Sequence, residues 1–195
     1  MKLETKTSKL YYGFPVILIG YKDKKWRYNV TACSSSYSLG DMITVGLRTE
    51  SNAVENIKEY GEFTVNVPCQ QILSKVEIAG FHSGQNKIGM ADMTYDPAKY
   101  IDAPVMDECI LSLECKVENI LEYGEYTNFV ASIKRRVVCE NLLDEEGNMK
   151  YTQFNPIYFM CDNKRVYRYF NEQSKNYGEN MGCSSEEDEY NPLCG

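Results

Sequence analysis

A run of hydroxyl side chains in the first third of the chain has the composition of a phosphate-binding turn. Residues 29–38 read Asn-Val-Thr-Ala-Cys-Ser-Ser-Ser-Tyr-Ser, and Arg48 follows just before an expected helix. A guanidinium can hold a phosphate with two parallel hydrogen bonds, and a helix N-terminus carries about half a positive charge. The pattern predicts a phosphate pocket without a Gly-rich loop. A solvated serine turn beside a surface arginine remains the alternative.

The other reactive side chains offer no comparable site. The single histidine, His82, lies in a Gly-rich segment without a nucleophile motif, so we expect a loop histidine. The eight cysteines contain no C-x-x-C pair and are expected to be thiols, although a metal site built from scattered cysteines stays open. Cys109 and Cys115 have an even offset in a predicted strand, which predicts that they share a face. We therefore predict no catalytic side chain and no metal site.

The distribution of charge narrows the class of partner. Five units of the net charge of −7 fall in residues 179–195, which hold five acidic residues and no Lys or Arg. We interpret this segment as an acidic, disordered tail, or alternatively as a docking segment, and residues 1–178 as one domain. The sequence has no cluster of basic residues of the kind that binds nucleic acid. The apolar run 14–21 is too short to cross a membrane. No signal peptide is recognisable, so we expect a cytoplasmic protein.

Apolar runs separated by turn residues predict a mainly β fold with a few helices. The expected strands are 14–20, 26–32, 42–47, 62–67, 110–121, 126–139, 157–161 and 165–170. One helix should begin after a cap at Ser51 or Asn52 and end at Gly61, and a second should cover 70–79. Residues 80–104 are expected to be a long irregular loop of the kind that often carries function. Since strands and helices do not alternate, an antiparallel barrel is favoured over a doubly wound sheet.

In their order along the chain, these segments resemble the flavin reductase-like, FMN-binding split-barrel family, and within it the flavoredoxin type. The resemblance runs from about Phe14 to Tyr169. It rests on Asn-Val-Thr-Ala-Cys-Ser at 29–34, Thr-Val-Gly-Leu-Arg at 44–48, Gly-Glu-Phe-Thr-Val-Asn-Val-Pro at 61–68 and His-Ser-Gly at 82–84. Each motif is weak alone, but their order is specific. The resemblance implies a homodimer of Greek-key split β-barrels with FMN near the dimer interface.

The resemblance also implies which residues bind the cofactor. They are Asn29, Thr31, Ala32, Cys33, Ser34, Ser35, Leu47, Arg48, Ser83, Gly84 and Lys87. Tyr167 is added from the residue pattern alone, because a late-strand tyrosine could stack on a planar ligand, although most such residues are half-buried barrel positions. The chain departs from the family at Gly40-Asp41-Met42, where members carry Asp-Pro-Pro, and at Ala53, where many carry Thr.

The function implied by the resemblance is that of an oxidoreductase in which FMN carries the chemistry. Electrons would come from NAD(P)H or from a redox protein partner. The chain has no counterpart of the C-terminal histidine that some members use near the nicotinamide, which weakens the case for NAD(P)H. The alternative is a non-enzymatic module that binds a flavin or a tetrapyrrole on the same barrel.

Overall fold

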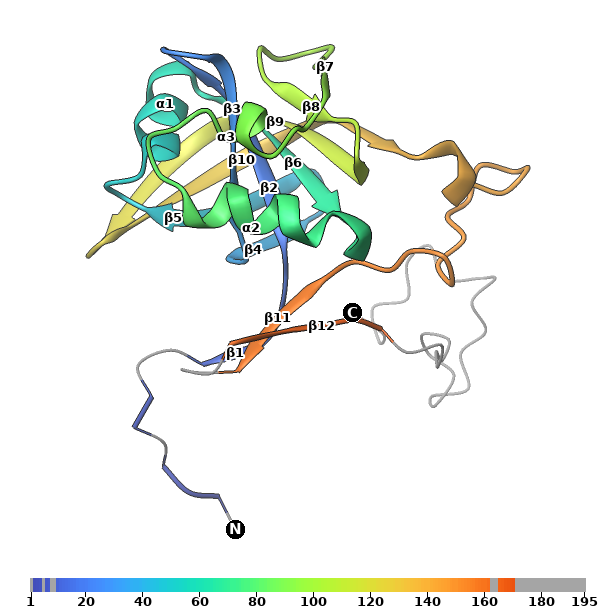
Figure 1. Ribbon diagram of the computed structural model, residues 1–195, viewed down its shortest axis with the longest axis horizontal. Coiled ribbons are helices and arrows are strands. Elements are labelled where there is room, and N and C mark those ends of the chain that lie inside the picture. The colour runs from blue at the N-terminus through green and yellow to red at the C-terminus, as the bar shows by residue number, and fades with distance from the viewer. Residues whose placement is uncertain (1, 5, 8–9, 162–164, 171–195) are drawn as a thin grey trace.

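The computed structural model describes residues 2–4, 6–7, 10–161 and 165–170, and seven antiparallel strands within them form the largest sheet (Figure 1). The strands are β2 (Ile17–Asp23), β3 (Arg27–Cys33), β4 (Ser36–Leu39), β5 (Met42–Arg48), β6 (Glu62–Pro68), β9 (Cys109–Tyr123) and β10 (Tyr126–Val138). Their order in the sheet is β3-β2-β6-β9-β10-β5-β4. The two ends of this order are joined along the chain, since β3 leads into β4 through Ser34 and Ser35, and the N–H of Gly46 in β5 donates to the carbonyl of Ser35 at 2.8 Å. The predicted tail 179–195 lies outside the described residues.

Both faces of β2 are covered, and its side chains alternate between two apolar clusters. In β2, Ile17, Ile19 and Tyr21 belong to the core cluster inside the barrel, which also holds apolar residues of β5, β6, β10 and the first helix. Val16 and Leu18 belong to a second cluster on the outer face of β2 and β3. The two clusters explain why this part of the sequence reads as a continuous apolar run rather than an alternating one.

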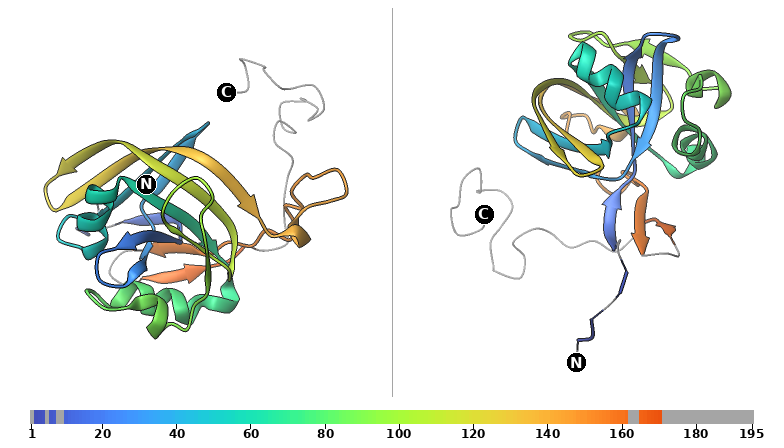
Figure 2. Two further views of the ribbon diagram at one scale, coloured as in Figure 1. Left: turned by 90° about the horizontal axis from the view of Figure 1, so that it is seen from above. Right: turned by 90° about the vertical axis from the view of Figure 1, so that its left-hand side faces the viewer.

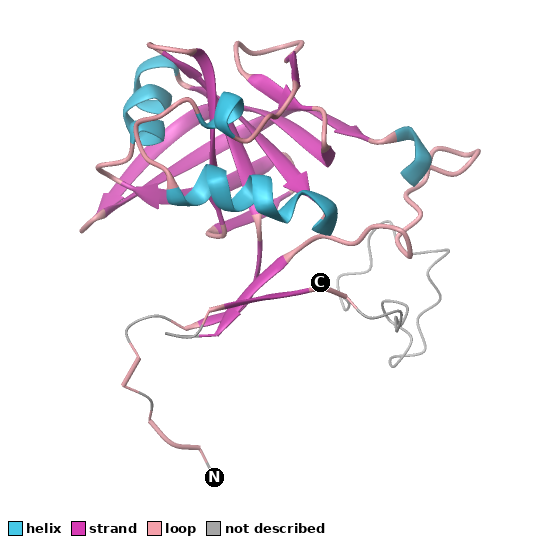
Figure 3. Cartoon of the chain, in the orientation of Figure 1, coloured by secondary structure: helices cyan, strands magenta, loops and turns pink. Residues whose placement is uncertain are grey.

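Three α-helices lie among the described residues. α1 (Asn52–Tyr60) closes one end of the barrel, while α2 (Leu73–Phe81) and α3 (Lys87–Met90) cover the outer face of β3 (Figure 3). α1 begins and ends where the sequence predicts. The Ser51 side chain accepts the N–H of Val54 at 3.3 Å, and Gly61 adopts a left-handed conformation with φ 69°. A 3₁₀ turn, Gln70–Ile72, precedes α2, so the second α-helix starts three residues later than predicted.

Two small sheets complete the described fold. β1 (Tyr11–Pro15), β11 (Tyr158–Cys161) and β12 (Val166–Arg168) form a three-stranded sheet that projects below the barrel (Figure 2). β7 (Tyr95–Pro97) pairs with β8 (Pro104–Met106), and a 3₁₀ turn, Glu140–Leu142, follows β10. Among the residues described, no helix has the length and apolar character needed to cross a membrane.

Three sequence expectations are corrected by the structure. The predicted strand 14–20 is divided between β1 and β2, which belong to different sheets, and the predicted loop 80–104 contains α3 and β7. Cys109 and Cys115 lie on opposite faces, in the outer and the inner core cluster respectively. The cause is a register shift in the β6–β9 ladder between Val67 and Pro68, which reverses the alternation of β9 at this point.

Candidate functional site

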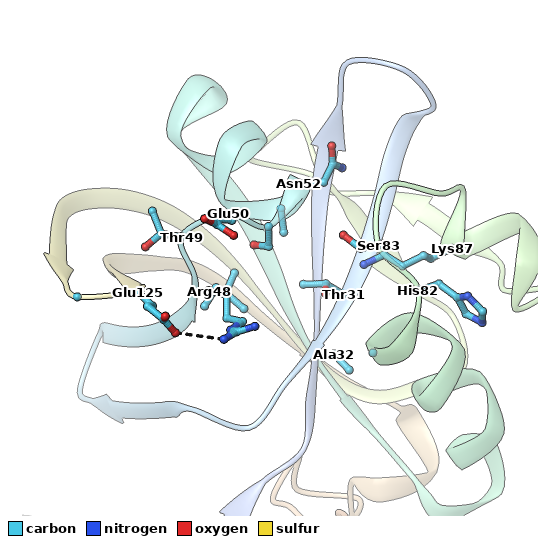
Figure 4. Close-up of a pocket in the computed structure, with 15 residues that line it drawn as sticks. Thr31, Ala32, Arg48, Thr49, Glu50, Asn52, His82, Ser83, Lys87 and Glu125 are labelled. Atoms are coloured by element: carbon cyan, nitrogen blue, oxygen red, sulfur yellow. Dashed lines mark hydrogen bonds and ion pairs between the residues drawn. The ribbon is translucent and has the colours of Figure 1, made fainter. Parts of the chain in front are cut away.

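The α1 pocket, with a volume of about 620 Å³, lies where four segments meet. These are the end of β3, the link from β5 to α1, residues 80–87 and the β9–β10 turn (Figure 4). Six residues predicted to bind the cofactor line it: Thr31, Ala32, Leu47, Arg48, Ser83 and Lys87. The volume is in the usual range for a small-molecule site.

The N-terminus of α1 faces this pocket. Ser51, Asn52 and Ala53 all line it, and Ser51 is the N-cap of the helix. The first backbone N–H groups of a helix have no partner within the helix, and the helix dipole adds partial positive charge there. This end of the pocket therefore favours a negatively charged group.

Lys87 adds a buried amine to the same pocket. The residue is only 5% exposed, and its side chain has no hydrogen-bond or ion-pair partner among the described residues. In the view of Figure 4 the Lys87 side chain extends towards Thr31. Burial lowers the pKa of Lys87 to about 8, although the charge of Asp23 acts in the opposite direction. The amine is not one of the fully buried unpartnered atoms of the described residues, so it opens into the pocket, where it can pair with an anionic ligand.

Arg48 is placed differently from Lys87. Its side chain is 70% exposed, and it donates to the Glu125 carboxylate at 3.1 Å across the mouth of the pocket (Figure 4). Glu50 also lines the pocket. A bound phosphate would have to compete with Glu125 for the guanidinium. Such an exposed pair is weak, so the competition costs little.

Asn29 lies behind the pocket, where it holds the surrounding segments together. Its amide nitrogen donates to Asp23 Oδ2 at 3.3 Å and to the Gln85 carbonyl at 2.9 Å. Its oxygen accepts the N–H groups of Val30 at 2.9 Å and Lys87 at 3.1 Å. With both its donors and its oxygen used inside the protein, the fully buried Asn29 fixes the start of α3 against β3.

Asp23 extends this network to α1. The Asn52 amide donates to Asp23 Oδ2 at 2.8 Å, and the N–H groups of Lys25 and Trp26 donate to its Oδ1. Burial acts to raise the pKa of Asp23, but these hydrogen bonds outweigh it and hold the pKa below its usual value. The ionised Asp23 thus ties the β2–β3 turn to the helix that faces the pocket.

Two further pockets adjoin the α1 pocket at Ala32, which lines all three. The Ser35 pocket, of about 510 Å³, lies between the end of β3 and β5 and contains Cys33, Ser34 and Ser35. The aromatic pocket, of about 440 Å³, lies between α2 and the small sheet and contains Tyr167. Burial raises the pKa of Cys33 to about 11, so this thiol stays protonated at neutral pH and is no nucleophile.

The predicted cofactor residues therefore fall into three groups. Nine line the α1 or the Ser35 pocket, Tyr167 lines the aromatic pocket, and Asn29 and Gly84 line none of the three. Sequence reasoning did not select the other polar lining residues as cofactor ligands; these are Thr49, Glu50, Ser51, Asn52, His82 and Glu125. Except for His82, their positions at a helix start and a hairpin turn could have indicated them, because both places bring polar groups to one end of a barrel.

The fold defined by these elements is that of the split-barrel flavin proteins. The flavoredoxin of Desulfovibrio vulgaris (Miyazaki F) matches with a TM-score of 0.82 and 26% identity over 90% of this chain and 97% of its own. The sequence matches the family model described as "Flavin reductase like domain" over residues 11–168, and the chain belongs to this family. The mainly β split-barrel fold expected from the sequence is thus confirmed.

Curated relatives of this chain include two proteins that carry no functional name. An uncharacterised protein of Pyrococcus abyssi is 29% identical over 58% of this chain, and one of Methanothermobacter thermautotrophicus is 35% identical over 60% of it. The matches span 65% and 58% of the length of these two relatives.

Proposed function

We propose that the protein is an FMN-binding oxidoreductase of the flavoredoxin type, which passes electrons between NAD(P)H or a redox protein partner and an acceptor. The proposal includes a homodimer in the cytoplasm. The observation that carries it is the α1 pocket, in which a helix N-terminus, Arg48 and the buried Lys87 amine converge in a chain of the flavin reductase-like family.

The residues present fit FMN in both size and charge. A phosphate suits the end of the α1 pocket, where Lys87 has no partner among the described residues and the first N–H groups of α1 point outward. A flat ring suits the strand end at Ala32, Cys33 and Ser34, where the α1 pocket continues into the Ser35 pocket. When bound, FMN would supply hydride and one-electron transfer chemistry.

The chain itself would contribute binding, orientation and protection from side reactions. Lys87 and the start of α1 would hold the phosphate, and the backbone and small side chains at 32–35 would shape the surroundings of the ring. The Cys33 thiol, protonated and donating to the Gly46 carbonyl at 3.3 Å, would not attack the ring. No side chain of this pocket is required to act as a general acid or base.

The first test is the visible absorption spectrum of the purified protein after addition of FMN and desalting. We expect FMN to be retained. NADH and NADPH are then added in separate samples without oxygen. Bleaching by either nucleotide would support a reductase, whereas retained flavin that stays yellow would point to a carrier reduced by a protein partner or to a non-enzymatic flavin-binding module. Loss of all flavin on desalting would contradict tight FMN binding.

A further inference from the structure

Four of the residues expected to hold FMN, Ala32, Cys33, Ser34 and Tyr167, also line the aromatic pocket, while its remaining walls have no role in the proposed function. It lies between α2 and the β1–β11–β12 sheet and has a volume of about 440 Å³. It shares Tyr11, Ala32, Cys33 and Ser34 with the Ser35 pocket and Ala32 and Gly80 with the α1 pocket. A molecule in this pocket would therefore lie beside a flavin ring placed at the end of β3.

The walls of the aromatic pocket suit a flat ring. The rings of Tyr11 and Phe159 meet edge to face with centroids 4.9 Å apart, and Phe159 and Tyr167 follow at 5.7 Å. The buried Val16 and Val76 also line the pocket. Aromatic walls of this kind bind a planar ring by further edge-to-face or offset contacts.

One positive charge at this pocket is available to a ligand. The charged residues that line it are Glu77 and Arg165. Glu77 lies beside the Tyr167 hydroxyl; burial first and then this carboxylate raise the pKa of Tyr167, which is a neutral donor at pH 7. Arg165 is exposed and has no ion-pair partner among the described residues. A guanidinium can bind a carboxylate through two hydrogen bonds, and a single carboxylate matches its one charge.

We propose that the aromatic pocket is a second binding site, which takes a small aromatic carboxylate with its ring against Tyr11, Phe159 and Tyr167 and its carboxylate on Arg165. The placement of this molecule beside a flavin ring rests on the proposed function. The binding of the aromatic acid itself does not.

The test is a calorimetric titration of the full-length, FMN-loaded protein with benzoate, and with benzamide as its neutral analogue. Arg165→Gln is compared with Arg168→Gln, which changes an exposed arginine that belongs to the same strand region but lines none of the three pockets. We expect benzoate to bind and Arg165→Gln to weaken it about tenfold or more. Benzamide should bind the unchanged protein about as weakly as benzoate binds Arg165→Gln. Arg168→Gln should leave the affinity for benzoate unchanged.

Several outcomes would overturn the inference: no binding of benzoate, equal binding of benzamide, equal effects of the two substitutions, or displacement of FMN by benzoate. The flavin absorbance, recorded in the same samples, separates this test from that of the proposed function. If FMN is not retained, the proposed function fails, and the same titrations on the flavin-free protein still decide whether the pocket binds the acid through Arg165.

Discussion

At the scale of single residues, Arg48 and Lys87 in the α1 pocket are expected to contribute differently to the affinity for a bound anion. Arg48 is exposed and already paired with Glu125, so a phosphate replaces one partner with another. Lys87 is buried and has no partner among the described residues. A charge-assisted hydrogen bond is strongest where water is excluded. The greater part of the affinity for the phosphate is therefore expected from Lys87.

Lys87→Met is predicted to weaken FMN binding about tenfold or more, because methionine fills the same buried space without the charge. Riboflavin, which lacks the phosphate, should bind both proteins equally. Arg48→Gln is the matched comparison and should weaken FMN binding only a few-fold. Fluorescence titration with both flavins measures these effects. Equal losses for FMN and riboflavin in Lys87→Met would show that the amine does not hold the phosphate.

The affinity for FMN is also predicted to fall as the pH rises above about 8. Burial lowers the pKa of Lys87 to about 8 in the free protein, and a bound phosphate would raise it. Between these two values the complex holds one more proton than its separated parts, so raising the pH weakens binding by at most about tenfold per unit. Titrations from pH 7 to 9.5 test this, and Lys87→Met should remove the dependence. An unchanged profile in that variant would assign the effect to another group.

The residue types of the site could be predicted from the sequence. Which of these side chains face the pocket and which bond to other protein groups could not. Thr31 and Arg48 were selected because hydroxyls and a guanidinium suit a phosphate, and both line the pocket. Asn29 was selected from the same motif, yet its side-chain amide makes all its hydrogen bonds to protein groups behind the pocket. Its partners Asp23 and Gln85 come from other segments, so only the folded chain shows this role.

At the scale of elements, the network around Asn29 joins β3, the β2–β3 turn and the start of α3. Asn29→Ala is predicted to lower the free energy of unfolding by about 2–4 kcal/mol, because it leaves several buried groups without partners. Asn119→Ala, an exposed asparagine in β9, is the control and should change it by less than about 1 kcal/mol. Urea unfolding measures both. Equal effects would show that the network adds nothing to stability.

Local signals determined which elements the sequence could predict. α1 was predicted correctly because its cap Ser51 and its stop Gly61 act through their own side chain and backbone. The division of the run 14–20 into β1 and β2 was missed because it depends on a distant partner: the N–H of Val16 donates to the Ile157 carbonyl at 2.8 Å. The sequence of residues 14–20 contains no signal that predicts this contact.

At the scale of the whole molecule, we expect a second copy to bind at the projecting sheet. β1 is an edge strand of the β1–β11–β12 sheet; Tyr12 within it is 76% exposed, and Leu10 just before it is 60% exposed. An unpaired edge with apolar side chains favours association. We predict that light scattering gives twice the chain mass of 22.4 kDa, and that Tyr12→Lys shifts the equilibrium towards the monomer. A monomeric wild-type protein would contradict the proposed dimer.

The β1–β11–β12 sheet is expected to form after the barrel when the chain folds during synthesis. Tyr11 pairs with Cys161, so β1 must wait until 150 further residues have been added before its partner exists. Closing so long a loop is slow compared with the nearby pairings β2–β3 and β9–β10. A chain still on the ribosome can thus complete the seven-stranded barrel and the α1 pocket first. The wall that carries Phe159 and Tyr167 is then the last part to be built, and a truncated chain would lose the aromatic pocket while keeping the α1 pocket.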